Sequence, residues 1–406
     1  MIKIGIVGCG RILAAHLRGY RILREAGVDD FEITALCARK ESDAQSYVQR
    51  GEGPSQRKAV SDMEGDPLAI DDEYLSDFQP GVNVEVFTDY REMIARGAID
   101  AVNDFTIHSL HHQVAEVAFQ NGKHLMSQKP LAVTVRAARQ MCERAEAAGV
   151  TFGVFENLRY LLGIRRTKWA FGPEGPLGDL QMALFGCAGA WWAPDQIVAE
   201  TPWRHKLLEA GGIALDMGPH WFDMVRYVGG EVKSVSAQTS VMEPVRYTRD
   251  ATGRVIDQLD CDADDTFFAN FETVAGARGT IYGSWAGHGG ATMAGEGAVF
   301  YGSKGRLSGD QLSLDDGKQQ SLEAIHQPKT PLGLSDDFAL AQHDWLEAIR
   351  TGTSPETSGE EGFKDLACAF AVVESAKAKR EVEVVEVENG RIESYQEPLN
   401  RHFGVA

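Results

Sequence analysis

Residues 3–13, Lys3-Ile4-Gly5-Ile6-Val7-Gly8-Cys9-Gly10-Arg11-Ile12-Leu13, decide the fold of the N-terminal half of the chain. The apolar, β-branched start of this stretch predicts a buried strand over residues 3–7. Residues 11–25 have helix-forming composition, with apolar side chains on recurring turns, and predict a helix. Gly8 and Gly10 lie between the two and predict a tight connection from strand to helix.

The residues that follow extend this unit into a sheet. A second strand is predicted at 31–37, followed by a polar helix at 41–50, which completes one βαβ unit. Two further buried strands are predicted at 99–105 and 123–127, separated by an apolar-faced helix over 112–120. This alternation indicates an α/β domain with a doubly wound parallel sheet.

The pattern changes after Gly149. Short alternating segments separated by glycine-rich turns indicate a largely antiparallel sheet; they are residues 179–184, 231–239, 266–271 and 279–284. Helical periodicity returns at 337–350 and 363–379. We therefore expect two domains, 1–152 and 153–406. Residues 51–81 are rich in Gly, Asp, Glu and Pro without sustained periodicity, and predict an acidic surface insertion.

Composition excludes several classes of protein. The 406 residues include 59 acidic and 40 basic side chains, a formal net charge of −19. So acidic a surface repels phosphate backbones and anionic lipids, which argues against nucleic-acid and membrane-surface binding. The longest apolar run, near 366–373, is too short to span a bilayer, and residues 1–7 are too short for a signal-peptide core. Six scattered cysteines suggest reduced, buried thiols, and we expect a cytoplasmic protein.

The glycine turn has a chemical interpretation. Gly8 allows the tight turn, and Gly10 lets the backbone approach a pyrophosphate at the positive end of the helix. The third position of a dinucleotide-binding fingerprint is Leu13 rather than Gly or Ala, and an ordinary strand-to-helix turn remains the alternative.

The end of the second strand bears on the choice of cofactor. The chain runs Cys37-Ala38-Arg39-Lys40, without the acidic residue that usually binds the ribose 2′-hydroxyl of NAD. A small residue followed by two cations favours NADP, with Arg39 pairing with the 2′-phosphate. The alternative is that Arg39 and Lys40 simply face solvent at the start of a helix.

Residues 211–223 contain a candidate acid/base pair. If they are helical after the glycines, Asp216 and His220 share one face, with Asp223 about one turn further. A carboxylate beside an imidazole stabilises its protonated form, which suits proton transfer to or from an alcohol or ketone. A purely structural hydrogen bond is the alternative.

Three separated motifs together resemble the Gfo/Idh/MocA oxidoreductase family, which includes glucose–fructose oxidoreductase and inositol dehydrogenase. They are Gly8-Cys9-Gly10-Arg11-Ile12, Ser127-Gln128-Lys129-Pro130-Leu131-Ala132 and the stretch from Gly211 to Asp223. The resemblance covers nearly the whole chain. It implies a Rossmann domain followed by an α/β domain for substrate binding and oligomerisation, with a large, mostly antiparallel sheet, and a homodimer or homotetramer formed through that sheet.

The resemblance also assigns catalytic roles. The family's Glu-Lys-Pro motif falls on Gln128-Lys129-Pro130, so that Lys129 lies beside the nicotinamide and contacts the reacting hydroxyl. Gln128 replaces the usual glutamate and removes a charge beside that lysine. The Asp-x-x-x-His element falls on Asp216 and His220, with His220 the proton acceptor and Lys129 stabilising the developing alkoxide.

Residues 106–111 resemble the family's Thr-Pro-Asn loop along the cofactor, with Ile107 in place of the proline. The full set expected to bind the cofactor is Gly8, Gly10, Arg11, Ile12, Ala38, Arg39, Lys40, Thr106, Ile107, His108, His111, Gln128 and Lys129. Without the resemblance, the spacing of His108, His111 and His112 could suggest a metal site, but no cysteine or further ligand is evident, and we predict no metal.

Two further stretches resemble substrate-facing parts of the family. Asn157 and Arg159 match an Asn-x-Arg-aromatic turn, and Trp203 and Arg204 match a Trp-Arg pair. We expect these four residues to bind substrate together with Lys129, Asp216 and His220. Trp191, Trp192 and Trp203 offer flat apolar faces for a sugar ring, with core packing as the alternative.

The sequence therefore predicts an NADP-dependent enzyme, with NAD as the alternative cofactor, that oxidises a secondary alcohol or reduces a carbonyl of a sugar, polyol or cyclitol. One alternative is a glycoside-cleaving enzyme that uses the cofactor only transiently, for which the dinucleotide would show no net redox change. Another is a non-catalytic regulator that senses a dinucleotide or a sugar, because fold alone does not fix function.

Overall fold

The computed structural model describes residues 1–59, 69–189, 194–289, 292–293 and 298–405. The chain divides into two compact units, which we describe separately. The first comprises residues 1–132, 137–160 and 329–363, and the second comprises 133–136, 161–328 and 364–406. The first unit thus includes a segment from the C-terminal third of the chain, which a single boundary near residue 152 does not allow for.

The first unit is built on a six-stranded parallel sheet with the order β3-β2-β1-β4-β5-β6. The strands are β1 (Ile2–Val7), β2 (Phe31–Cys37), β3 (Glu85–Phe87), β4 (Ala101–Asp104), β5 (His124–Gln128) and β6 (Phe152–Phe155). The order reverses between β1 and β4, and ligands of such sheets bind beyond the carboxyl ends of the strands at this point. The predicted doubly wound parallel sheet is confirmed.

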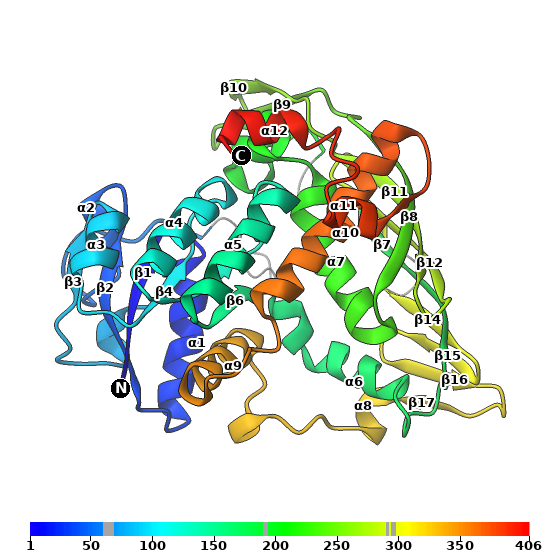
Figure 1. The fold of residues 1–406 in the computed structure, drawn as a ribbon, viewed down its shortest axis with the longest axis horizontal. Coiled ribbons are helices and arrows are strands. Elements are labelled where there is room, and N and C mark those ends of the chain that lie inside the picture. The colour runs from blue at the N-terminus through cyan, green and yellow to red at the C-terminus, as the bar shows by residue number, and fades with distance from the viewer. Residues whose placement is uncertain (60–68, 190–193, 290–291, 294–297, 406) are drawn as a thin grey trace. The chain divides into compact units, whose positions relative to one another are not determined.

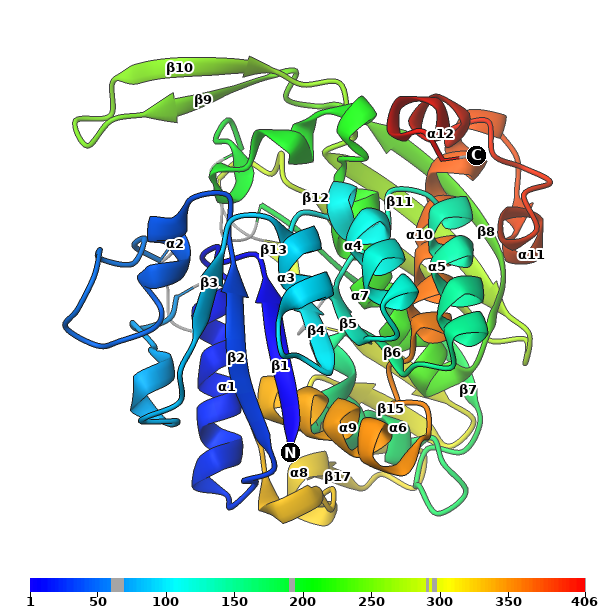
Figure 2. The same cartoon turned by 60° about the vertical axis from the view of Figure 1, so that its left-hand side comes forward.

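Helices cover both faces of this sheet, as Figure 2 shows. They are α1 (Leu13–Glu25), α2 (Glu41–Gln45), α3 (Tyr90–Arg96), α4 (His108–Gln120), α5 (Val135–Ala148) and α9 (Asp337–Thr351). Gly19 of α1 lies against Phe338 and Gln342 of α9, where a larger side chain would collide. The fully buried Trp345 belongs to the same core, so the late segment completes the hydrophobic centre of the first unit.

The helix predicted at 41–50 is wrong in length, because α2 ends at Gln45. The insertion that follows bonds the carbonyls that a longer helix would use: Leu75 and Ser76 donate their backbone N–H groups to the carbonyls of Tyr47 and Val48. Tertiary hydrogen bonds therefore end a helix that local composition favoured.

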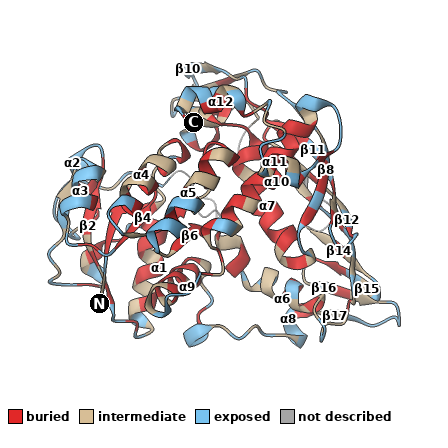
Figure 3. Cartoon of the chain, viewed as in Figure 1, coloured by how far each residue is buried: buried red, intermediate tan, exposed pale blue. Residues whose placement is uncertain are grey.

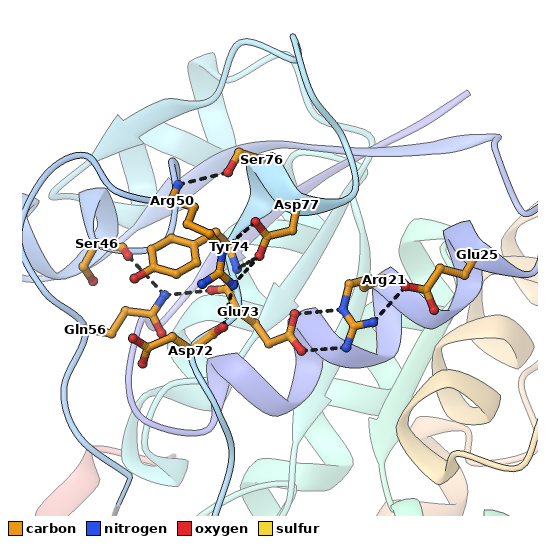
Figure 4. Close-up of polar contacts among 10 residues, drawn as sticks. All are labelled: Arg21, Glu25, Ser46, Arg50, Gln56, Asp72, Glu73, Tyr74, Ser76 and Asp77. Carbon is orange, nitrogen blue, oxygen red and sulfur yellow. Dashed lines mark hydrogen bonds and ion pairs between the residues drawn. The ribbon is translucent and has the colours of Figure 1, made fainter.

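Ion pairs link the described part of the insertion, residues 51–59 and 69–81, to α1 and to Arg50, which directly precedes the insertion (Figure 4). Arg21 of α1 donates from Nε and Nη2 to the buried carboxylate of Glu73, at 3.0 and 2.8 Å. Arg50 donates to Asp77 and lies 4.4 Å from the ring centre of Tyr74. Some of the acidic residues of the insertion thus serve as partners for arginines at its base.

The second unit contains a ten-stranded sheet with the order β17-β16-β15-β14-β7-β12-β11-β8-β18, and β13 also pairs with β7. Its strands are β7 (Leu180–Ala188), β8 (Val232–Ser240), β11 (Thr266–Thr273), β12 (Arg278–Ser284), β13 (Thr292–Met293), β14 (Val299–Gly302), β15 (Gly305–Ser308), β16 (Gln311–Leu314), β17 (Gln319–Ser321) and β18 (Val382–Glu383). Within the described residues β7 and β12 pair in parallel, and the other pairs are antiparallel. This confirms the predicted mostly antiparallel sheet.

The helices of this unit pack against the sheet and against one another. They are α6 (Leu162–Ala170), α7 (Ile213–Gly229), α8 (Leu322–Ile325), α10 (Gly359–Ala378, which begins in the first unit), α11 (Val384–Glu388) and α12 (Glu397–Phe403). Trp221 and Phe222 of α7 contact Phe267 and Phe271 of β11, with ring centres 5.7 and 6.4 Å apart. Figure 3 shows α7 buried along most of its length, so the residues it carries are held in fixed positions.

A separate two-stranded ribbon, β9 (Val245–Arg249) and β10 (Val255–Asp260), extends from the second unit beside the large sheet (Figure 1). None of the helices in the described ranges has both the length and the apolarity needed to cross a bilayer.

Candidate active site

The glycine turn after β1 has the geometry of a dinucleotide-binding turn. Gly8 has φ +102°, and a Cβ there would lie 2.6 Å from the carbonyl carbon and oxygen of Phe105. A Cβ on Gly10 would meet nothing within 4 Å, so the backbone there faces open space. The N-terminus of α1, a 13-residue helix, follows directly. Backbone without side chains at the positive end of a helix fits a pyrophosphate.

Two neighbours explain how this turn is held. Leu13, in the third fingerprint position, is fully buried in the core, so its side chain is accommodated there without a glycine. The hydroxyl of Tyr47 donates a hydrogen bond to the carbonyl of Gly10 at 2.9 Å. No local sequence pattern identifies Tyr47, because its partner lies 37 residues away in the chain, on the other side of β2.

The chain after β2 exposes two cations. Ala38 is buried and donates its N–H to the carbonyl of Phe87 at 3.1 Å, which fixes the path of the backbone as it leaves β2. Arg39 and Lys40, which follow, are exposed. The carboxylate of Asp43, in the first turn of α2, is paired with Arg57 at 2.5 Å. The end of β2 therefore presents positive charge where a 2′-phosphate or a ribose hydroxyl would be recognised.

The loop after β4 is organised by a buried carboxylate that the sequence analysis did not single out. Asp104 Oδ1 accepts hydrogen bonds from the backbone N–H and the hydroxyl of Thr106, at 3.0 and 2.6 Å. Burial raises the pKa of Asp104, although His111 and these bonds act in the opposite direction. The sequence feature that could have identified Asp104 is its position as a carboxylate at the end of a buried strand.

His111 joins the loops that follow β4 and β5. Its Nδ1 lies 3.0 Å from the carbonyl oxygen of Pro130, and its Nε2 lies 3.2 Å from that of Thr106. The ring is fully buried, so it supports the loop from within, whereas Ile107 at the start of α4 is 48% exposed. His108 is buried, and the described residues contain no cluster of His, Cys, Asp and Glu able to hold a metal ion.

Gln128 is the last residue of β5, and Lys129 and Pro130 follow it. Because β1, β4 and β5 are adjacent parallel strands, the turns that contain Gly8, Thr106 and Lys129 lie at one edge of the sheet of the first unit. Lys129 is partly exposed there, while Pro130 is buried. The structure thus brings together the predicted cofactor residues of these three turns.

The helix that carries Asp216 and His220 begins against a buried carboxylate. Gly212 has φ +113°, and a Cβ there would collide with Asp264 Oδ1. Asp264 accepts from the backbone N–H of Ala214 at 3.1 Å through Oδ2, and its carbonyl accepts from Ile213 at 2.9 Å. Asp264 therefore caps the positive end of α7 from a distant part of the chain.

Burial raises the pKa of Asp264 to about 7, more than the backbone N–H donors lower it. An unfolded chain releases this proton near pH 3.9. Asp264 therefore stabilises the fold fully below about pH 4, and this contribution is lost as pH rises through about 7. We expect the free energy of unfolding of Asp264→Asn, relative to wild type, to increase between pH 4 and 8, measured by urea denaturation. The control is Asp262→Asn, which changes an exposed neighbouring carboxylate. If the free energies of unfolding of wild type and Asp264→Asn changed in parallel with pH, the raised pKa of Asp264 would be contradicted.

Asp216 and His220 lie four residues apart on α7, and only 5% and 9% of their respective surfaces is exposed. Asp216 Oδ2 accepts from Arg204 Nε at 2.8 Å, and Arg204 also donates to the hydroxyl of Thr201 at 2.5 Å. The Arg204 guanidinium lies 4.4 Å from the ring centre of Trp203. The structure thus brings the Trp203-Arg204 pair together with Asp216 of the Asp-x-x-x-His element. The ion pair holds Asp216 one turn before His220.

Asn157 and Arg159 make contacts within the first unit. Asn157 Nδ2 donates to Asp337 at 2.5 Å, and Arg159 pairs with Glu361 at 2.9 Å and donates to the carbonyl of Glu356 at 2.9 Å. These bonds hold the short helix at 157–160 in place. A role of either residue in substrate binding stays a prediction, and Trp191 and Trp192 lie outside the described residues.

Comparison with known proteins agrees with this geometry. Residues 2–156 match the model of an oxidoreductase family with an NAD-binding Rossmann fold, and residues 173–308 match the GFO/IDH/MocA C-terminal domain. The chain is 30% identical to a 1,5-anhydro-D-fructose reductase from Ensifer adhaerens over 314 residues, 73% of this chain and 83% of that protein. It is 31% identical to a D-xylose dehydrogenase from Paenarthrobacter nicotinovorans over 205 residues, which is 49% of this chain and 51% of that protein.

Among solved structures, a levoglucosan dehydrogenase in complex with NADH superposes with a TM-score of 0.72 at 20% identity, over 94% of this chain and 99% of that one. This likeness extends the shared fold over both units. Together with the two family models and the relative from Ensifer adhaerens, it leads to one conclusion: the chain belongs to the Gfo/Idh/MocA family of oxidoreductases, with an N-terminal NAD-binding Rossmann fold.

Proposed function

We propose that this oxidoreductase prefers NADP and acts on a secondary alcohol or carbonyl of a sugar, polyol or cyclitol. The observation that carries the proposal is the partly buried ion pair of Arg204 with Asp216, one helical turn before His220. An imidazole positioned beside a fixed carboxylate is suited to exchanging a proton with a substrate hydroxyl.

Several residues have a defined role in this proposal. Gly8 allows the tight turn after β1, and Gly10 leaves backbone accessible to the pyrophosphate. Lys129 would donate to the reacting oxygen and stabilise negative charge as it develops, while His220 takes up the hydroxyl proton and Asp216 orients His220. A bound nicotinamide supplies hydride donation or acceptance at its C4 position.

The substrate class is supported by the names of relatives. The alignments include enzymes named D-xylose dehydrogenase, D-apiose dehydrogenase, levoglucosan dehydrogenase and myo-inositol 2-dehydrogenase. Their common chemistry is oxidation of a carbohydrate or cyclitol hydroxyl. A panel of such compounds, followed by absorbance at 340 nm with NADP⁺, tests the proposal, and the reverse reaction is followed with NADPH. Cleavage of a glycoside without net change in the dinucleotide would instead favour transient use of the cofactor.

The preference for NADP rests on Arg39 and Lys40, which are exposed directly after β2. A charge-assisted hydrogen bond contributes about 1.5–3 kcal/mol. Arg39→Ala is therefore expected to weaken NADPH binding by about 10-fold to 100-fold and to leave NADH binding within about twofold. Fluorescence titration of both dinucleotides measures this. Arg96→Ala, which removes an exposed arginine of α3, is the control. Equal weakening of both dinucleotides would contradict the preference.

We also propose that the protein forms a homodimer or homotetramer through the sheet of the second unit. Met182, Leu184 and Phe268 of this sheet are 45%, 39% and 55% exposed, and Phe268 stacks on Tyr282. Exposed apolar side chains gathered on one sheet are typical of an interface. Phe268→Glu is expected to shift the mass measured by light scattering to that of one chain; an unchanged mass, or a wild-type monomer, would contradict this.

A further inference from the structure

Gln128 bonds two different partners, and the direction of both bonds can be derived. Its Oε1 accepts from the backbone N–H of Lys129 at 2.9 Å, and its Nε2 lies 3.1 Å from Nε2 of His16. A backbone N–H can only donate, so the amide atom that faces it is the oxygen. The amide nitrogen therefore faces His16 and donates to it, and the His16 ring must carry its proton on Nδ1.

His16 is enclosed on several sides by apolar rings. It stacks on Phe105 with ring centres 3.5 Å apart and an interplanar angle of 14°, and it meets the edges of Phe155 and Phe338 at 4.3 and 5.1 Å. The ring is fully buried, and burial holds the pKa of His16 well below its ordinary value. The imidazole is thus a fixed, neutral acceptor, and Gln128 has one orientation that satisfies both of its partners.

We infer that His16 and Gln128 are positioning residues for Lys129, through a directed chain of hydrogen bonds from the Lys129 N–H to the Gln128 amide and from that amide to His16. The inference rests on the proposed catalytic role of Lys129. Fixing the backbone beside its Cα fixes the point from which the ammonium extends. A misplacement of about 1 Å can cost on the order of 100-fold in rate, so this support matters for turnover.

The neutral amide gives the chain of bonds its direction. A glutamate at position 128 could still accept from the Lys129 N–H, but a carboxylate has no proton to donate to His16. His16 would then have to carry its proton on Nε2 and donate instead. The two residue types at position 128 are therefore interchangeable as supports for Lys129, but they require opposite tautomers of His16.

The tautomer is tested on the whole protein, without any activity assay. The ¹⁵N spectra of histidine-labelled protein, with the His16 signal assigned by its loss in His16→Gln, should show protonated Nδ1 and unprotonated Nε2 between pH 5.5 and 8. In Gln128→Glu the proton should move to Nε2. A wild-type His16 that is an imidazolium, or that carries its proton on Nε2, overturns the inference. This measurement holds even if other variants fail to fold.

Steady-state kinetics then distinguish a positioning role of Gln128 for Lys129 from a role of Gln128 in packing alone. Gln128→Leu removes both hydrogen bonds and is expected to lower kcat by about tenfold to 100-fold, with the Kd for NADPH within about threefold. Gln128→Glu restores the bond to Lys129 and should recover most of the kcat that Gln128→Leu loses. Equal losses in both variants, or no loss in Gln128→Leu, overturn the positioning role. Lys129→Ala is measured in parallel: full activity there would overturn the proposed function of Lys129 itself.

Discussion

Replacement of Lys129 by alanine is expected to lower kcat by about 100-fold to 10,000-fold, because the variant loses the ammonium that we propose stabilises the developing alkoxide. Lys129 is partly exposed after β5, at the sheet edge that also carries Gly8 and Thr106. The pyrophosphate-binding turn is untouched, so the Kd for NADPH should change by less than about fivefold. Turnover of the best substrate at 340 nm, together with a fluorescence titration, measures both quantities.

Lys123→Ala is the matched control for this prediction. Lys123 directly precedes the same strand at its amino end, and its Nζ donates to the carbonyl of Ile99 at 2.7 Å. This variant loses a structural contact and should keep kcat within about twofold. Unchanged turnover in Lys129→Ala, or an equal loss in Lys123→Ala, would contradict the catalytic assignment.

Replacement of His220 by glutamine is expected to lower kcat by about 100-fold to 10,000-fold, because the amide cannot take up the hydroxyl proton. The substitution keeps a polar side chain of similar length in a position that is 9% exposed, so folding should be preserved. The Kd for NADPH should stay within about twofold. Initial rates at 340 nm and a fluorescence titration with NADPH measure both quantities.

His288→Gln is the control for His220, because His288 is an exposed histidine of the same unit, paired with Glu243 at 2.8 Å. Asp216→Asn adds a second comparison. It keeps the shape beside Arg204 and removes the negative charge that we propose orients His220, so its kcat should fall between those of wild type and His220→Gln. A His220→Gln enzyme with wild-type kcat would assign proton transfer to another group.

Local sequence signals predicted much of the architecture. The strand, the glycines and the helix around Gly8 are adjacent in the chain, and β2 begins and ends at the predicted residues. Alternation of apolar residues likewise predicted β8, β11 and β12 to within a few residues. In these segments the spacing of apolar residues along the chain matches the positions that the folded core buries.

The parts that were not predicted depend on contacts between distant residues. The Arg204 pair with Asp216 and the Asp264 cap of α7 span 12 and 50 residues, respectively. The early end of α2 follows from hydrogen bonds with the insertion, and the place of α9 in the first unit follows from packing against Gly19. Composition and periodicity carry no information about such partners, because each side chain is compatible with many others until the chain has folded.

The most direct test of the account is titration calorimetry of the purified chain with NADPH and, separately, with NADH. We expect a saturable signal with both dinucleotides and at least tenfold tighter binding of NADPH. No binding of either dinucleotide up to millimolar concentration would contradict this expectation. The glycine turn after β1 would then hold no cofactor, and the proposed roles of Lys129 and His220 would lose their basis.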